Sequence, residues 1–404
     1  MDDFAPKRKA VYPWAFFVAM AAILLLFFGL QALFPVLPLY IIHIGGSPAD
    51  NGLASWALAL AALLTRPLAG VLADRWGRRP VLVLGAVLLS GGPPLYAFAS
   101  NVPLLLGARA IHGVGLALFS TAYPAFIADL LPPGRYGEGL GLANAVPMLS
   151  MAVAPLLGEW AEREFGFEGL FLALGAVGGI GVLATLMLPG RGGSGHGQAL
   201  RLGSEQAGLR RALRHRGVRV GTLGMALLGL PFGAFMVFLP LLADMRGLGG
   251  TGWAFTAFAI AASLSQPAAG RFADRWGTRK TALAGLALVG LVAGGLAAVA
   301  DRWALLALAG LFGVGFGAAR AGLEARVQGS VGAALRGSAA AAQYAAYDLL
   351  IGFGSWGLGV LAGATDYRVM YAAAGGITLL GLVVGRLVVG RRKITDKGRE
   401  RRGC

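Results

Sequence analysis

The sequence predicts an all-α integral membrane protein whose twelve transmembrane helices form two parallel six-helix bundles. Three observations lead to this prediction. Apolar residues make up 57% of the 404 residues and charged residues only 13%, whereas soluble domains carry roughly 25% charged residues. Twelve apolar runs are each long enough to cross a bilayer as a helix, which takes roughly 20 residues. A pattern in the first half of the chain also returns about 200 residues later.

The first apolar run follows three basic residues, Lys7, Arg8 and Lys9. It is too long for the apolar region of a signal peptide, so we interpret it as a retained transmembrane helix. The twelve runs cover residues 13–42, 52–73, 80–99, 103–128, 137–160, 168–188, 218–243, 252–273, 280–299, 303–325, 337–363 and 368–390.

The grouping of these runs predicts four regions. The segment between the sixth and seventh runs contains Gly192–Gly195, which predicts flexibility, and then a basic amphipathic stretch that we expect on the inner membrane surface. The regions are an N-terminal bundle over 1–188, a cytoplasmic linker over 189–217, a C-terminal bundle over 218–390 and a basic cytoplasmic tail over 391–404.

Positive charge is unevenly divided between the two sides of the predicted membrane. The net charge is +16, and 26 Lys and Arg residues lie in the loops and tails of one side against four on the other. Because basic loops stay in the cytoplasm, we expect a multi-pass protein with both termini cytoplasmic. We further expect its membrane to be a prokaryotic inner membrane. The basic residues lie in short segments between apolar runs, which excludes nucleic-acid binding as the reason for the surplus.

The sequence contains few groups suited to cofactor or catalytic chemistry. Cys404 is the only cysteine and the four histidines are scattered, so we expect neither a disulfide nor a metal site. Lys280-Thr281 lacks the upstream glycine of a phosphate-binding loop, which argues against ATP-driven transport. The alternative to a transport protein is a membrane-embedded enzyme or a receptor-like sensor. An enzyme would need a polar catalytic cluster at one membrane face, and the sequence suggests no such cluster. We therefore expect a monomer in the bilayer that needs no cofactor and is not an enzyme.

The internal repeat relates the two halves of the chain. Gly70–Arg79 reappears as Gly270–Arg279, at an offset of 200 residues. Two halves in the same orientation suit alternating access, in which they rock about a site near mid-membrane and open it to one side at a time. Further matches are Pro67 with Pro267, Gly113 with Gly313, Gly115 with Gly315, and Leu37-Pro38-Leu39 with Leu239-Pro240-Leu241 at an offset of 202.

Several of these segments match known sequence motifs. Gly70–Arg79 resembles the major facilitator superfamily signature between helices 2 and 3, G-x-L-a-D-r-x-G-r-[KR], and Arg109–Gly115 is similar to the helix-4 motif R-x-x-x-G-x-G. Pro35–Tyr40 and Asp129–Gly141 are similar to the drug/proton antiporter branch, the efflux permeases. Helix 5 departs from that branch, because Ala154 stands before its proline where glycine is usual.

The resemblance covers the whole chain and implies the twelve-helix fold of a secondary transporter. It further implies that protons and a small-molecule substrate are the partners, with a small organic or amphipathic compound exported in exchange for protons. An importer or uniporter for a sugar or organic anion is the alternative within the same fold.

A cytoplasmic gate is the first site that the resemblance implies. Asp74 lies at the inner end of the second helix, where a carboxylate can accept hydrogen bonds from free N–H groups at a facing helix N-terminus. The implied partner is the helix that begins near Arg336, when the cytoplasmic side is shut. Ordinary loop charges are the alternative. The predicted gate residues are Gly70, Asp74, Arg75, Gly77, Arg78 and Arg79, with Asp129 as the partner of the arginines and Asp274 and Arg275 as counterparts.

Four residues inside the predicted spans, Asp348, Arg66, Arg109 and His112, are candidates for proton coupling. Asp348 lies near mid-membrane, where an ionisable group is costly and usually functional. We expect it to carry the proton, with a structural pairing as the alternative. Arg66 can pair with Asp348, because helices 2 and 11 are neighbours in this fold, or it can bind an anionic substrate.

Arg109 and His112 are both in the helix-4 motif. Arginine keeps its proton in proteins, so Arg109 would tune a carboxylate, and the alternative is an arginine satisfied by backbone carbonyls. For His112 the alternative to proton transfer is a packing residue held by hydrogen bonds.

A substrate cavity is expected to be mostly apolar with a few polar groups. Arg320 and Glu324 are four residues apart, which predicts a local ion pair with a structural or gating role. The polar and aromatic candidates for the cavity wall are Gln31, Tyr123, Asn144, Gln343, Tyr344 and Tyr347.

Overall fold

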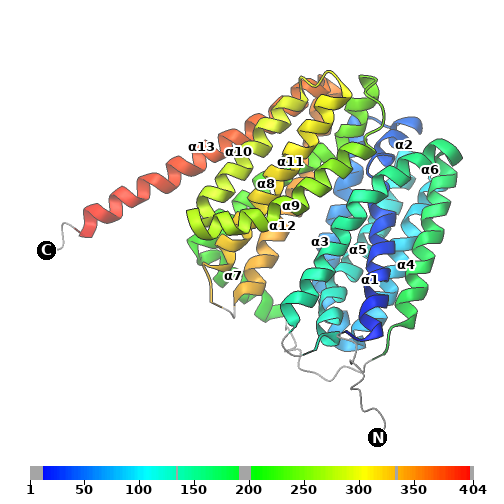
Figure 1. Ribbon diagram of the computed structural model, residues 1–404, viewed down its shortest axis with the longest axis horizontal. Helices are drawn as coiled ribbons and strands as arrows, with labels where there is room; N and C mark the ends of the chain where they lie inside the picture. Colours follow the sequence, from blue (N-terminus) through cyan, green and yellow to red (C-terminus); the bar gives the residue numbers. More distant parts are fainter. Residues whose placement is uncertain (1–11, 133–134, 191–201, 333–334, 401–404) are drawn as a thin grey trace, which may run out of the picture.

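The computed structural model describes residues 12–132, 135–190, 202–332 and 335–400, and the regular structure of these segments is helical. The helices form two groups that lie side by side, with α1 to α6 in one and α8 to α13 in the other (Figure 1). The helices are α1 (Trp14–Gln31), α2 (Leu37–His43), α3 (Pro48–Trp76), α4 (Arg78–Ala97), α5 (Val102–Leu130), α6 (Tyr136–Met187), α7 (Leu202–Arg214), α8 (Arg216–Met245), α9 (Gly252–Trp276), α10 (Thr278–Leu296), α11 (Arg302–Gln328), α12 (Arg336–Ala364) and α13 (Tyr367–Glu400).

Twelve membrane spans follow from these helices. Ten of the described helices are long and apolar enough to cross a membrane. One of them, α6, contains two spans, because its backbone turns at Gly166, whose φ of 70° is left-handed. The twelfth is α9, in which polar residues such as Gln266 lower the mean hydropathy. The first predicted run is broken between α1 and α2, near Pro35, which has no N–H to donate to a helix.

The internal repeat is visible in the packing of the helices. In the first half, a Cβ atom on Gly113 would overlap the carbonyl oxygen of Leu58, so α5 and α3 touch backbone to backbone. In the second half, Gly313 of α11 meets the carbonyl oxygen of Phe258 on α9 in the same way. Small residues allow this approach where water provides no driving force for helix association. The repeated glycines therefore build the same helix contact twice.

The two halves touch each other mainly through α3 with α12 and α6 with α9. The amphipathic part of the predicted linker is helical in α7, which packs against α8 and α12. Lys7–Lys9 and Gly192–Gly195 lie outside the described residues, as does the end of the predicted tail. The exact bounds of the four regions stay a prediction.

Candidate functional site

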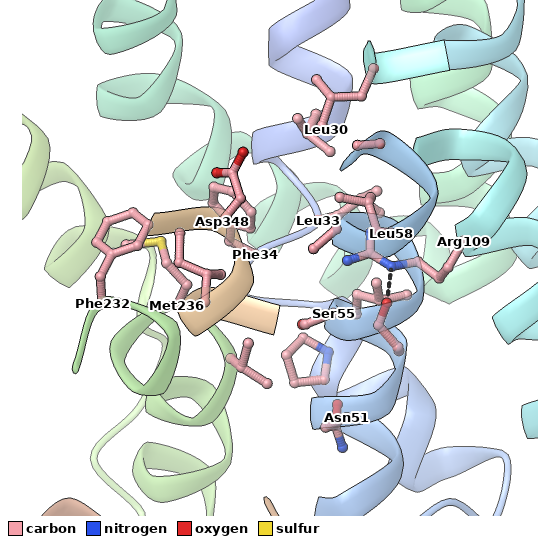
Figure 2. A pocket seen from close by; sticks show the side chains of 18 of the residues that line it. Leu30, Leu33, Phe34, Asn51, Ser55, Leu58, Arg109, Phe232, Met236 and Asp348 are labelled. Carbon is pink, nitrogen blue, oxygen red and sulfur yellow. Dashed lines mark hydrogen bonds between the residues drawn. The ribbon is translucent and has the colours of Figure 1, made fainter. Parts of the chain in front are cut away.

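A cavity of about 210 Å³ lies between the two halves. Its walls come from α1, α2, α3 and α5 of the first half and from α8 and α12 of the second, and most of its lining is apolar (Figure 2). Polar groups of the wall include Asn51 and Ser55. Apolar lining residues include Leu33, Phe34, Leu58, Phe232 and Met236.

Three charged residues line this cavity, namely Arg66, Arg109 and Asp348. Arg66 Nη1 donates to Asp348 Oδ2, and this ion pair connects α3 to α12 and so one half to the other. The side chains are 34% and 25% exposed, which places the pair at the edge of the open space rather than within a helix contact. Of the two roles that the sequence offered for Arg66, the pairing with Asp348 is present in the structure. The ion pair spans the interface that must rearrange if the halves rock.

Arg109 lies on a wall formed by the first half, whereas Asp348 comes from the second (Figure 2). The side chain of Arg109 is buried, and the Nε of Arg109 donates to the carbonyl oxygen of Ala54 at 3.3 Å. In the described segments Arg109 has no recorded ion pair. The lining thus contains two guanidinium groups and one carboxylate, which leaves it with a positive balance.

His112 lies away from the cavity lining, in the packing between α4 and α5. It is fully buried, and its Nδ1 is 2.6 Å from the hydroxyl oxygen of Tyr96. The ring lies so close to Gly92 that a Cβ there would overlap it. The sequence grouped His112 with the proton-coupling residues, but the structure gives it the surroundings of a packing residue. Its role in coupling stays a prediction.

The six predicted cavity residues are not part of the lining of this cavity. Gln31 is buried and its Nε2 donates to the carbonyl oxygen of Pro147 at 3.1 Å. Tyr347 stands directly behind the wall, with its ring centroid 5.7 Å from that of the lining residue Phe232. Of the remaining candidates, Tyr123 packs on Phe119, Asn144 is exposed, Gln343 is buried, and Tyr344 belongs to the network described next.

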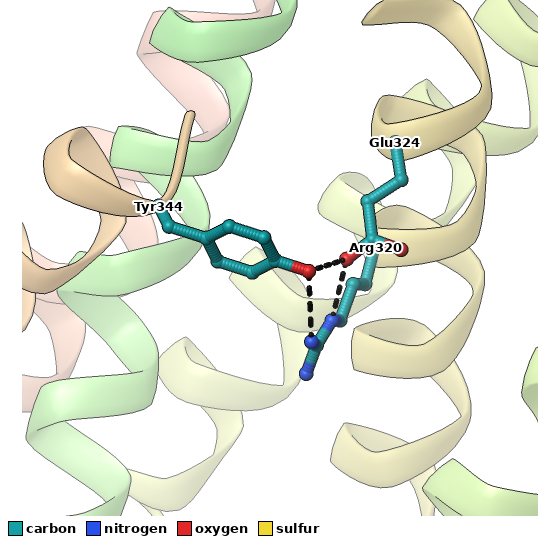
Figure 3. A network of polar contacts seen from close by, with 3 residues as sticks. All are labelled: Arg320, Glu324 and Tyr344. Carbon is teal, nitrogen blue, oxygen red and sulfur yellow. Dashed lines mark hydrogen bonds and ion pairs between the residues drawn. The ribbon is translucent and has the colours of Figure 1, made fainter. Parts of the chain in front are cut away.

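Arg320, Glu324 and Tyr344 form a polar network between α11 and α12 (Figure 3). Arg320 Nε donates to Glu324 Oε1 at 2.8 Å, as their spacing predicts, and the hydroxyl of Tyr344 donates to the same oxygen at 2.8 Å. A guanidinium nitrogen of Arg320 lies 3.3 Å from that hydroxyl. The tyrosine therefore ties the ion pair of one helix to the neighbouring helix, which the spacing of charges alone did not reveal.

The predicted cytoplasmic gate is only partly assembled. Arg78 pairs with Asp129 and also donates to the carbonyl oxygen of Ala125, so this arginine joins α4 to α5. Arg79 Nη2 donates to the carbonyl oxygen of Leu186 at 2.6 Å. Gly77 has a φ of 88°, a left-handed conformation that glycine adopts readily and that turns the chain from α3 into α4.

The acidic residues of the gate motif are exposed. For Asp74 the described segments record no hydrogen bond, so its expected contact with the start of α12 is not formed in this conformation. A Cβ on Gly70 would meet nothing within 4 Å, so the face of α3 that carries Gly70 has no close neighbour. Arg75, Asp274 and Arg275 are exposed as well.

The opposite, predicted outer, end is shut by close backbone contacts. A Cβ on Gly52 of α3 would overlap the carbonyl oxygen of Ser355 on α12. One turn farther out, a Cβ on Gly359 would lie 2.5 Å from the carbonyl oxygen of Pro48. The halves are therefore in contact at the predicted outer end and apart near the gate motif, an inward-facing arrangement under the predicted topology.

Glu159 makes a contact at the predicted outer end that the sequence did not reveal. Its Oε2 accepts a hydrogen bond of 2.9 Å from the backbone N–H of Gly252, the first residue of α9, and its Oε1 lies 3.3 Å from Arg163. A carboxylate at a helix N-terminus gains from the free N–H groups and the helix dipole. This is the arrangement expected of Asp74, found instead at the outer end. An acidic residue directly after Gly158 inside an apolar run was the available signal.

Replacing this carboxylate should loosen the outer contact. We expect Glu159→Ala to shift the equilibrium toward the outward-open state by roughly tenfold, since a charged hydrogen bond contributes about 1.5–3 kcal/mol. In a Cys404→Ser background, a cysteine introduced by Ser55→Cys in the cavity wall should then react faster with a membrane-impermeant maleimide added outside. Glu164→Ala is the control, because Glu164 is exposed nearby and no ion pair of it is recorded in the described segments. If the Glu159→Ala and Glu164→Ala variants are labelled at equal rates, Glu159 has no part in closing the outer end.

Comparison with known proteins agrees with this architecture. A family model described as the Major Facilitator Superfamily matches residues 19–252 and again residues 222–403. Quinolone resistance protein NorA of Staphylococcus aureus is 28% identical over 171 residues, an alignment that covers 42% of this chain and 43% of NorA. The matched region thus spans less than half of the length of this relative.

Solved structures share the fold at low sequence identity. The nucleoside transporter NupG has a TM-score of 0.75 at 15% identity, with 92% of this chain and 99% of NupG covered. The peptide transporter POT has a TM-score of 0.77 at 14% identity, with 94% and 95% covered. The predicted fold of two parallel six-helix bundles is confirmed. Because the family model matches each half in turn and spans nearly the whole sequence, the chain belongs to the Major Facilitator Superfamily and is a multi-pass membrane protein.

Proposed function

We propose that this transporter exports a small organic or amphipathic compound from the cytoplasm in exchange for protons. The observation that carries the proposal is the ion pair of Arg66 and Asp348, which joins the two halves at the edge of a mainly apolar cavity. An apolar cavity with few polar groups suits an amphipathic ligand. The similarity to a quinolone resistance protein supports the same direction of transport.

The proposed coupling rests on competition for one carboxylate. A proton and the Arg66 guanidinium both bind the carboxyl group of Asp348, so binding of one displaces the other. Protonation from the outside releases Arg66 from α12 and weakens a bond between the halves. After the halves rock inward, re-formation of the pair expels the proton to the cytoplasm. The direction requires the predicted orientation, with both termini cytoplasmic in an inner membrane.

The proposed gates take turns during this cycle. Glu159 with the start of α9 closes the outer end in the structure described above. Asp74 with the start of α12 closes the inner end in the opposite state, held in place by the pair of Arg78 and Asp129. The chain acts as a monomer in this scheme, because the cavity is formed by its own two halves.

The test is a proton-flux measurement in everted membrane vesicles. A pH gradient, acidic inside, is established and followed with a pH-sensitive dye, and a quinolone is added. Exchange of the compound for protons should collapse the gradient, as seen from recovery of the dye signal. Vesicles without the transporter are the control. Uptake of labelled compound with an unchanged gradient would exclude proton-coupled export.

A second candidate function is import or uniport of an organic anion. It is favoured by Arg109, which lines the cavity without a recorded ion pair in the described segments and leaves the wall with excess positive charge. The same vesicles separate the two functions. An anion carrier of this kind would move a labelled carboxylate down its own gradient whether or not a pH gradient is present.

A further inference from the structure

A second cavity, of about 490 Å³, lies in the C-terminal half and outside the transport path. It is a groove bounded by α8, α10, α11, α12 and α13, and apart from two arginines its lining is apolar. Leu223, Ile377 and Val384 of the lining are 65%, 47% and 56% exposed, so the groove opens on the outer surface of the bundle. In a membrane protein this surface faces the acyl chains of lipids.

The groove is open at one end because of how α13 packs. Toward the predicted outer end, Gly375 of α13 approaches the backbone of Gly290 and Gly294 on α10, which closes the space between these helices. Toward the other end, α13 diverges from the bundle (Figure 1). The space between α8, α10 and α13 therefore widens toward the predicted cytoplasmic side.

The two arginines of the lining, Arg279 and Arg326, mark that cytoplasmic end. Arg279 belongs to the first turn of α10 and Arg326 to the last turn of α11. The Nε of Arg326 is buried without a hydrogen-bond partner, and Arg279 and Arg216 both repel this guanidinium electrostatically. In the described segments neither Arg279 nor Arg326 has a recorded ion pair. Arg279 and Arg326 thus carry positive charge that no ion pair recorded in the described segments offsets.

We propose that the groove is a binding site for one anionic glycerophospholipid of the cytoplasmic leaflet. Its phosphate binds Arg279 and Arg326, and an acyl chain lies along the apolar wall past Leu227 and Leu286. Basic pockets between transmembrane helices on the cytoplasmic side suit such headgroups, and arginine forms directed pairs with phosphate oxygens. A free phosphate ion would account for the arginines but not for the apolar groove. An uncharged apolar compound would account only for the groove.

The test uses the purified full chain and native mass spectrometry. Phosphatidylglycerol and phosphatidylcholine with the same acyl chains are added in turn, and retained lipid is counted at increasing concentration. We expect the unmodified chain to retain phosphatidylglycerol roughly tenfold more tightly than phosphatidylcholine. The double variant Arg279→Gln/Arg326→Gln should lose this preference. Arg302→Gln/Arg368→Gln removes the same charge from exposed residues at the opposite membrane face and should keep it.

A second variant tests the apolar part of the site separately. Ala226→Trp fills the groove and leaves both arginines in place. The Ala226→Trp variant should no longer retain phosphatidylglycerol. In a separate measurement on the unmodified chain, inorganic phosphate should compete only weakly with the lipid. Equal retention by the two double variants, or full competition by inorganic phosphate, would overturn the proposal. Size-exclusion chromatography checks that each variant is folded, and the preference of the unmodified chain for phosphatidylglycerol can be measured without any variant. None of these readouts depends on the proposed transport function.

Discussion

Asp348→Asn is expected to abolish transport driven by a pH gradient while leaving substrate exchange in place. The amide cannot take up a proton, but it keeps the shape of the side chain and can still accept a hydrogen bond from Arg66. We expect gradient-driven flux to fall by roughly two orders of magnitude. This is the lower end of the rate loss expected when a side chain that transfers a proton is removed. The flux is measured in vesicles with an imposed pH gradient. Exchange is measured as counterflow of labelled against unlabelled substrate without a gradient.

The two measurements distinguish a proton carrier from a structural residue. If Asp348 only holds α3 and α12 together, counterflow should fall along with the driven flux. Glu168→Gln is the matched control, since it also converts a carboxyl group to an amide but lies exposed outside the cavity lining. Full gradient-driven transport by the Asp348→Asn variant would rule out Asp348 as the carrier.

Gly52→Ala is expected to trap the transporter in outward-open states. The added Cβ would overlap the carbonyl oxygen of Ser355, which is backbone and cannot swing aside. The outer contact between α3 and α12 can then form only if a helix shifts. We expect transport to fall by roughly tenfold or more, which corresponds to about 1.4 kcal/mol or more against the inward-facing state. Labelling of the Ser55→Cys variant from outside should rise in parallel.

Gly357→Ala provides the control for the effect of alanine itself. Gly357 is on α12, and a Cβ there would meet nothing within 4 Å. Both substitutions replace glycine by alanine within a helix, so both gain about the same helix propensity, close to 1 kcal/mol. A difference between the variants therefore reports on the contact with Ser355. Wild-type transport and labelling in the Gly52→Ala variant would show that the outer ends do not approach this closely during the cycle.

Much of the fold could be predicted because bilayer thickness imposes a length on each apolar run. The sequence also indicated three ion pairs. Arg78 and Asp129 were expected to meet at the signature loop, and Arg320 and Glu324 were expected to pair along one helix. Pairing of Arg66 with Asp348 was one of two roles considered for Arg66, since helices 2 and 11 are neighbours in this fold. Deep charges can be paired in this way because an unpaired charge in a membrane is costly and few partners exist.

The cavity wall was much harder to predict. The polar and aromatic candidates chosen from the sequence lie behind or away from the lining, whereas Asn51 and Ser55 contribute to it. The rotation of a helix about its axis decides which side chains face the cavity, and these helices are apolar on nearly all sides. Hydrophobic periodicity, the usual guide to orientation, is therefore weak here.

By itself the sequence determined the number of spans, the two-fold repeat and the rare residues that carry charge into the membrane. These follow from local composition, because the cost of placing polar groups in lipid acts on each segment separately. Only the tertiary structure decided which end of the transporter is closed, that Glu159 meets the start of α9, and that Arg279 and Arg326 share a groove. Those features depend on how whole helices pack against each other, and glycine contacts far apart in the sequence set that packing.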